Sequence, residues 1–134
     1  MRSEPVTTIL IADDASRIRL LLRTVLEAAG YVVLEAADGV ATLAAIVEHR
    51  PAIVILDVVM PGLSGLEVCR AVRADPSLAD TRLILVSGNA TEADALGSGA
   101  DRFLAKPFLP SRILAAVGAA GTGAPAAANS SGDE

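Results

Sequence analysis

Short apolar runs, each followed at once by a polar or charged residue, constrain the fold of this 134-residue chain most strongly. Four such runs end before Asp13-Asp14, at Asp57, at Ser87 and before Lys106. A short aliphatic run bounded by turn residues is typical of a strand that is buried on both faces. Parallel strands end at one common edge of the sheet, where open α/β folds place their sites. The sequence therefore predicts that these polar side chains share one pocket.

Helical periods separate the predicted strands. Apolar residues from Ile18 to Ala29 recur at the spacing of one face of an amphipathic helix, and Gly30 follows as its expected C-terminal cap. The strands are expected at residues 9–12, 31–36, 52–57, 83–86 and 101–105, and the last helix at 110–117. Five alternating strand and helix segments predict an α/β fold, with a parallel sheet covered by helices on both faces.

Composition narrows the class of protein. The hydrophobic content is 52% with only 2% aromatic residues, so the core must be aliphatic. A net charge of −5 argues against a nucleic-acid surface in this domain. No apolar run approaches the roughly 20 residues that span a membrane, and no signal peptide is visible, so we expect a cytoplasmic protein. We expect one domain over residues 6–118, followed by a flexible Gly/Ala/Pro-rich tail or truncated linker over 119–134.

The polar residues at the strand ends favour phosphoryl chemistry. A carboxylate such as Asp57 can act as a nucleophile and form an acyl phosphate if cations offset the charge repulsion. The adjacent carboxylates of Asp13 and Asp14 favour binding of Mg²⁺, which usually takes one or two protein carboxylates and keeps several waters. Lys106 would add a second positive charge, and Ser87 a hydroxyl donor.

Each of these residues taken alone also has a purely structural explanation. An Asp pair before a helix commonly caps it, and a Ser after a strand commonly begins a turn. The complete set, in this order and always at a strand end, favours the functional interpretation.

From Thr7 to about Val117, the chain resembles the receiver domain of bacterial response regulators. The resemblance rests on Asp13-Asp14, Asp57, Met60-Pro61, Ser64-Gly65, Val86-Ser87 and the run from Gly99 to Phe108. It implies a flavodoxin-like, doubly wound sheet with strand order 2-1-3-4-5. It also implies a phosphorylation-activated switch of a two-component system that catalyses only its own phosphorylation and dephosphorylation.

The resemblance also assigns roles to individual residues. Asp57 would accept a phosphoryl group from a sensor histidine kinase or a histidine phosphotransfer protein, and Ser87 and Lys106 would bind that group. Lys106-Pro107 would form a cis peptide bond. The ligands of Mg²⁺ would be Asp14, Asp57, the backbone carbonyl of Val59 and, through a water molecule, Asp13.

Three further residues take regulatory roles by the same resemblance. Ser87 would move toward the phosphoryl group, and the ring of Phe103 would fill the space it leaves. Val59 and Asn89 occupy positions that tune the lifetime of the acyl phosphate. The fourth helix, left as residues 91–96, is about one turn shorter than is usual in the family, where it belongs to the face that signals to partners or dimerises.

Other functions remain open at this stage. A haloacid-dehalogenase-like phosphatase needs a second Asp two positions after its nucleophile, where this chain has Val59. A flavin- or nucleotide-binding protein needs a phosphate-binding loop after the first strand, where this chain has carboxylates. The main alternative is a phosphorylation-independent, receiver-like module that binds another protein. A stand-alone regulator, which would dock onto a downstream protein, and a receiver truncated from a longer protein both fit the sequence.

Overall fold

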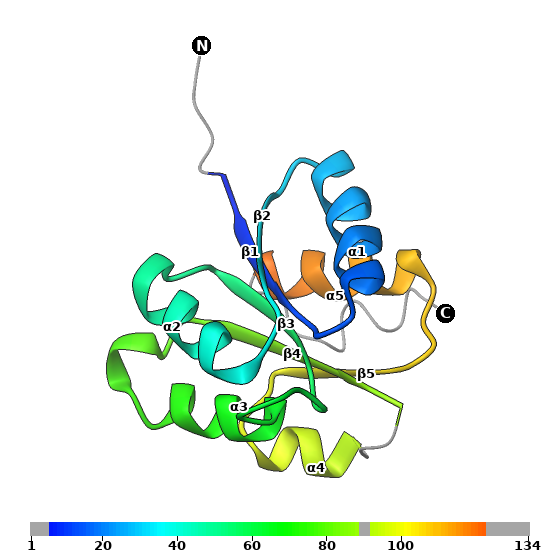
Figure 1. The fold of residues 1–134 in the computed structure, drawn as a ribbon. Coiled ribbons are helices and arrows are strands. Elements are labelled where there is room, and N and C mark those ends of the chain that lie inside the picture. The colour runs from blue at the N-terminus through cyan, green and yellow to red at the C-terminus, as the bar shows by residue number, and fades with distance from the viewer. Residues whose placement is uncertain (1–5, 89–91, 123–134) are drawn as a thin grey trace.

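The computed structural model describes residues 6–88 and 92–122, which form a parallel five-stranded sheet in the order β2-β1-β3-β4-β5 (Figure 1). The strands are β1 (Thr8–Ala12), β2 (Val32–Ala36), β3 (Ile53–Asp57), β4 (Arg82–Ser87) and β5 (Arg102–Ala105). The predicted fold class and strand order are both confirmed. Every neighbouring strand pair is parallel, so the carboxyl ends of the strands share one edge.

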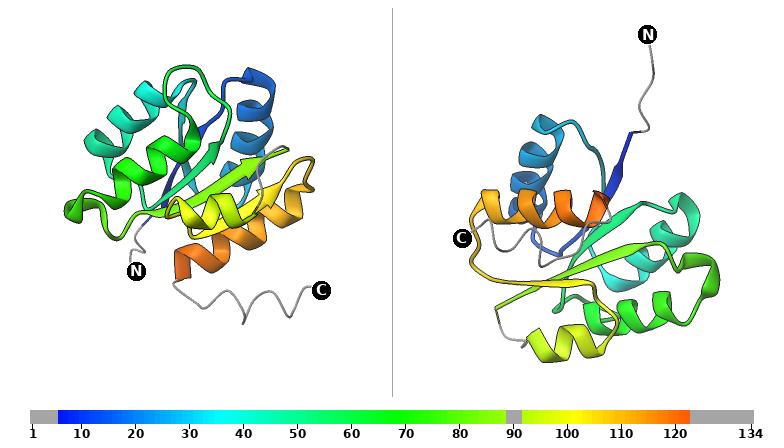
Figure 2. Two further views of the ribbon diagram at one scale, coloured as in Figure 1. Left: turned by 90° about the horizontal axis from the view of Figure 1, so that it is seen from below. Right: turned by 180° about the vertical axis from the view of Figure 1, so that it is seen from behind.

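Helices cover both faces of the sheet. They are α1 (Ser16–Ala28), α2 (Gly39–His49), α3 (Gly65–Arg73), α4 (Glu92–Gly97) and α5 (Pro110–Thr122), with a short 3₁₀ turn η1 (Pro76–Leu78). Helices α1 and α5 lie on one face and α2, α3 and α4 on the other, as the views of Figure 2 also show. This is the doubly wound arrangement that the alternating pattern predicts.

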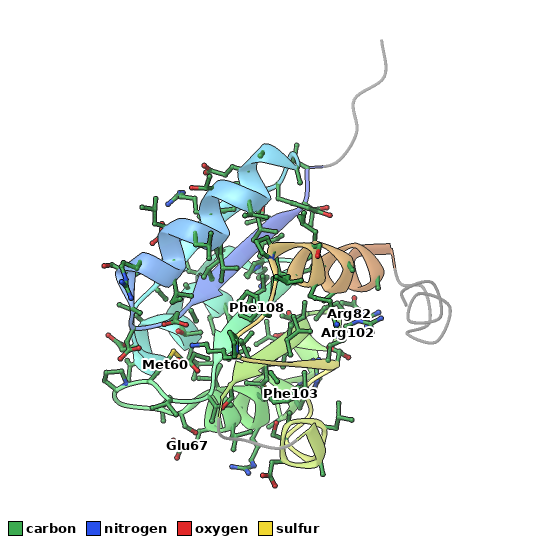
Figure 3. The ribbon with its side chains drawn as sticks, turned by 90° about the vertical axis from the view of Figure 1, so that its right-hand side faces the viewer. Met60, Glu67, Arg82, Arg102, Phe103 and Phe108 are labelled. Atoms are coloured by element: carbon green, nitrogen blue, oxygen red, sulfur yellow. The ribbon has the colours of Figure 1, made fainter. Side chains whose placement is uncertain are left out.

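The two faces of the sheet bury separate aliphatic cores. Alternate residues of each strand point to opposite faces, so Val54 and Leu56 pack under α2 and α3 while Ile53 and Ile55 pack under α1 and α5. Figure 3 shows Phe103 on the side of α4 and Phe108 on the side of α5, each half-buried against the core of its own face. The core is aliphatic, as the composition requires.

Local sequence signals set several helix ends. Ser64 and Glu67 form a reciprocal capping box at the start of α3, and the Asp38 side chain accepts a hydrogen bond from the Ala41 amide at the start of α2. Arg50 ends α2 in the left-handed conformation, with a φ of 47°. These caps set where α2 and α3 begin and where α2 ends.

The last helix is longer than the sequence pattern indicated. It continues to Thr122, so residues 119–122, assigned above to the tail, are helical. Alanine is the strongest helix former, and the Ala-rich stretch here extends the helix despite its glycines. None of the helices in the described part of the chain has the length and apolar character that a membrane crossing requires.

Candidate functional site

The carboxyl edge of the sheet brings most of the predicted site residues together. Asp57 ends β3 and lies in register with Val86, one residue before Ser87 at the end of β4. Ser87 in turn pairs with Ala105, one residue before Lys106. Asp13 follows β1, where its amide donates to the carbonyl of Ala36 at 3.1 Å. The register of four strands therefore places these groups at one edge.

Lys106 joins two of the carboxylates. Its Nζ lies 3.2 Å from Oδ2 of Asp13 and 3.3 Å from Oδ2 of Asp57. Its backbone amide donates to the Ser87 carbonyl at 2.9 Å, and the Lys106-Pro107 bond is cis, as the resemblance implies. The two carboxylates raise the pKa of Lys106 above its usual value, although burial opposes them, so its ammonium form is favoured.

Asp57 is more enclosed than most surface carboxylates, with 8% of its surface exposed. Burial raises the pKa of the Asp57 carboxyl; the Lys106 ammonium opposes this rise, and the nearby Asp13 carboxylate adds to it. The amide of Val59 donates to Oδ1 at 3.4 Å. A further positive charge at the site would therefore stabilise the ionised form of the Asp57 carboxyl.

The loop after Asp57 is folded tightly against its own strand. The Gly65 amide donates to the Val58 carbonyl at 2.8 Å, and a Cβ added at Gly65 would lie 2.3 Å from the Asp57 carbonyl oxygen. Only glycine permits this close approach. Within the loop, the Met60 side chain is buried, whereas Val59 is 58% exposed at the mouth of the site.

The donor set at the edge fits a hard divalent cation. Oxygen atoms of Asp13, Asp14 and Asp57 can all lie within 4.8 Å of one another, with Asp14 exposed and the other two buried. Carboxylate oxygens are the ligands that Mg²⁺ prefers in proteins. The three residues offer more negative charge than the Lys106 ammonium neutralises, so a bound cation would complete the charge balance.

Ser87 and Phe103 lie on the face of the sheet that α2, α3 and α4 cover. Ser87 is 2% exposed and continues the alternation of Leu83 and Leu85, which belong to the core under α2, α3 and α4. Phe103 packs against this same core from β5, in register with Leu85. The predicted switch pair therefore occupies adjacent strands on one face. Asn89 lies outside the described residues.

Arg19 is a residue of the site region that the sequence motifs did not indicate. Its guanidinium Nη1 donates to the backbone carbonyl of Asp13 at 2.7 Å, and its Nε donates to Glu35 at 2.8 Å. The available signal was weak: an arginine in the first turn of the helix that follows the acidic pair. Its partner on β2 could be found only from the folded structure.

Known proteins resemble this chain over most of its length. The family model for the response regulator receiver domain matches residues 9–118. The DNA-binding response regulator MtrA of Mycobacterium tuberculosis (strain ATCC 25618 / H37Rv) is 36% identical over 109 residues, covering 81% of this chain and 48% of MtrA. The phosphate regulon transcriptional regulatory protein PhoB of Pseudomonas aeruginosa is 37% identical over 111 residues, with the same coverage. The chain thus spans about half the length of these curated relatives.

Solved structures show the same domain. The chemotaxis response regulator CheY4 of Vibrio cholerae superposes with a TM-score of 0.81 at 30% identity, covering 87% of this chain and 99% of CheY4. The signal receiver domain of a histidine kinase from Syntrophus aciditrophicus gives a TM-score of 0.82 at 28% identity, covering 88% and 92%. With the family match extending over most of its length, this chain belongs to the response regulator receiver domain family of two-component signal transduction.

Proposed function

We propose that this receiver domain is switched by phosphorylation of Asp57, with a sensor histidine kinase or a histidine phosphotransfer protein as the donor. One observation carries the proposal: the Lys106 ammonium lies 3.2 Å and 3.3 Å from the carboxylates of Asp13 and Asp57. This places a fixed cation beside the candidate nucleophile, within a cluster of three carboxylates that fits a divalent metal.

In the proposed reaction, an Asp57 carboxylate oxygen attacks the phosphorus of a phosphohistidine. The new O–P bond forms as the P–N bond breaks, and the bonding electron pair leaves with the imidazole nitrogen, which takes up a proton. The product is an acyl phosphate on Asp57. The transfer adds negative charge to a site that is already acidic. Positive groups that stabilise the added charge therefore decide whether the transfer can proceed.

Asp14, Asp57 and the Val59 carbonyl would hold Mg²⁺ directly, with Asp13 acting through a water molecule. When bound, the metal supplies positive charge to the phosphoryl oxygens. Lys106 already pairs with a carboxylate oxygen of Asp57. After the transfer, its ammonium would pair with an oxygen of the phosphoryl group instead. The Ser87 hydroxyl would donate a hydrogen bond to another phosphoryl oxygen.

The conformational change that follows phosphorylation would involve the face of the sheet that carries Ser87 and Phe103. Movement of Ser87 toward the phosphoryl group frees volume beside β5, which the Phe103 ring can fill. Support comes from their placement on adjacent strands and on the same core. Such a local change at a phosphorylation site can bias a two-state element.

The lifetime of the acyl phosphate would depend on the side chains around it. Val59 is apolar and exposed at the mouth of the site, so it cannot orient an attacking water molecule. Asn89 could do so. We expect the acyl phosphate to last at least minutes without a phosphatase, and a half-life of seconds would contradict this expectation.

Outside its own phosphorylation and dephosphorylation, the domain would catalyse no reaction and would work in the cytoplasm through a downstream protein. MtrA is described as DNA-binding and PhoB as a transcriptional regulator, so transcriptional output is one candidate for the whole protein. The complete acidic set and Lys106 disfavour a phosphorylation-independent module.

The test is the mass of the intact protein after incubation with acetyl phosphate or phosphoramidate and Mg²⁺. We expect the wild type to gain the mass of one phosphoryl group, and Asp57→Asn or a chelator to abolish the gain. Asp80→Asn is the matched control, since Asp80 is an exposed aspartate just before the amino end of β4, at the edge of the sheet opposite Asp57. A wild type that gains no mass, or an Asp57→Asn variant that still gains it, would refute the proposal.

A further inference from the structure

The first helix contributes a side chain to the organisation of the acidic pair. Arg19 lies in the first turn of α1, and its side chain is 17% exposed. Its Nη1 donates to the Asp13 carbonyl at 2.7 Å, while its Nε forms an ion pair with Glu35 at 2.8 Å. Glu35 belongs to β2, beside which α1 runs (Figure 1). Arg19 therefore connects Glu35 on the edge strand β2 to the backbone of Asp13.

The contact falls on the peptide group that joins the two acidic residues. The Asp13 amide donates to Ala36 at 3.1 Å, and Oδ1 of Asp13 accepts from the Ala15 amide at 2.9 Å. The peptide between Asp13 and Asp14 is held at its carbonyl, which accepts from Arg19. The peptides directly before and after it are held by the bonds of the Asp13 and Ala15 amides. Asp14 is exposed, and this peptide determines where its carboxylate can reach.

We propose that Arg19, held in place by Glu35, is a positioning residue that orients the Asp13-Asp14 peptide for binding of a divalent cation. The inference rests on the function proposed above and adds a residue to it. Arg19 touches neither reacting atoms nor metal ligand oxygens; it acts through the backbone of Asp13. A planar guanidinium can bond two partners at fixed angles, which an ammonium cannot reproduce.

The sign of the effect separates positioning from simple electrostatics. Arg19 is a cation near a cation site, so removing its charge should strengthen Mg²⁺ binding if charge were all that mattered. Loss of a positioning contact should instead weaken binding, because Asp14 would have to be ordered when the metal binds. Removing groups that orient metal ligands typically costs about tenfold or more in metal affinity.

The same helix offers a matched control. Arg23 lies one turn further along α1 and also pairs with Glu35, and its Nη2 donates to the Val33 carbonyl at 3.0 Å. The Arg23 side chain bonds Glu27, Glu35 and the Val33 carbonyl, and these partners lie outside the Asp13-Asp14 segment. Arg23→Gln therefore removes an arginine with the same acidic partner while leaving the site backbone untouched.

The experiment is a titration of the full chain with Mg²⁺ alone, followed by the backbone amide resonances of residues 13, 14 and 59. We expect Arg19→Gln to weaken Mg²⁺ binding by about tenfold, and Arg23→Gln to leave it within about twofold. Arg19→Lys keeps the charge but loses the two-pronged contact, so it should also weaken binding. Unchanged or tighter binding in Arg19→Gln, or equal weakening in Arg23→Gln, would overturn the inference.

The outcomes also separate this inference from the proposed function. If the wild type binds Mg²⁺ and gains a phosphoryl group while Arg19→Gln binds the metal equally well, the inference fails and the proposed function stands. If the wild type neither binds Mg²⁺ nor gains mass, the proposed function fails and this inference fails with it. Far-ultraviolet circular dichroism identifies a variant that has not folded, and Glu35→Gln, which weakens the anchor of Arg19, then provides a second variant expected to lose affinity.

Discussion

The two ends of the sheet hold ionic clusters of opposite character. At the carboxyl edge, one ammonium faces the carboxylates of Asp13 and Asp57, with Asp14 nearby, and the balance is negative. Before the amino ends of β4 and β5, the Arg73 guanidinium donates to the carbonyls of Gly99 and Thr81 at 2.8 Å and 2.9 Å. It also pairs with Asp101 at 2.7 Å. The carboxyl edge therefore keeps an excess of negative charge, whereas at the amino end Arg73 and Asp101 neutralise each other.

This difference separates a site from a structural clamp. Asp101 completes the clamp because its Oδ2 also accepts from the Leu83 amide at 2.8 Å, and a Cβ added at Gly99 would lie 2.4 Å from Cγ of Arg73. Among the described residues, Arg73 Nη1 is a buried side-chain nitrogen without a hydrogen-bond partner. The clamp therefore ties α3 to the segment between α4 and β5, and substitution at the two ends should affect different properties.

The largest effect should follow from removing the cation of the carboxyl edge. Lys106→Met keeps most of the stem but leaves the Asp57 carboxylate without its ion pair. We expect phosphorylation by acetyl phosphate to slow by about 100-fold, the usual cost of losing one donor to a developing anionic group. The rate of mass gain measures this, with Arg112→Met, on the exposed side of α5, as the control. An unchanged rate in Lys106→Met would remove Lys106 from the mechanism.

A smaller effect, of a different kind, should follow at the clamp. Arg73→Ala removes three hydrogen bonds from a partly buried guanidinium, so we expect the free energy of unfolding to fall by about 2 kcal/mol. The phosphorylation rate of the folded protein should change little. Urea denaturation measures the stability.

Arg82→Ala is the matched control for the clamp. Arg82 is more exposed, and its Nη1 lies 4.0 Å from the other oxygen of Asp101. Its loss should change stability by less than about 0.5 kcal/mol. If the two variants were equally stable, the clamp would not be the structural element that its contacts indicate.

The smallest effect concerns pH. Burial, opposed by Lys106 and assisted by Asp13, raises the pKa of Asp57 in the folded protein, so the folded state holds this proton more tightly than the unfolded chain. The stability contributed by Asp57 therefore falls as the pH rises from the ordinary aspartate pKa through the raised folded pKa, and it stays lower above that value.

Asp57→Asn removes this titration. Its stability relative to the wild type should therefore increase with pH across that window and then level off. Urea denaturation between about pH 3 and 8, without divalent metal, measures the difference. A difference that stays constant over this range would show that the folded and unfolded pKa values of Asp57 are alike.

Much of the fold and the site followed from local patterns. Short aliphatic runs predict buried strands, and polar residues at their ends predict the shared edge where Asp57 and Lys106 meet. Arg19 and Arg73 escaped prediction because their partners are brought close only by folding: Glu35 is 16 residues from Arg19, and Asp101 is 28 residues from Arg73. The end of α5 was misplaced because glycine and alanine give opposing signals there.

The alternation of side chains along the strands has a consequence for how this domain could diversify. Asp57 continues the series of Ile53 and Ile55, which pack under α1 and α5, whereas Ser87 and Phe103 belong to the layer under α2, α3 and α4. We expect substitutions within one layer to change the packing of that layer more than that of the other. If Asp57 is the phosphoryl acceptor and Phe103 the switch, as proposed, substitutions behind one could accumulate without altering the other, and only the strand ends would have to stay unchanged.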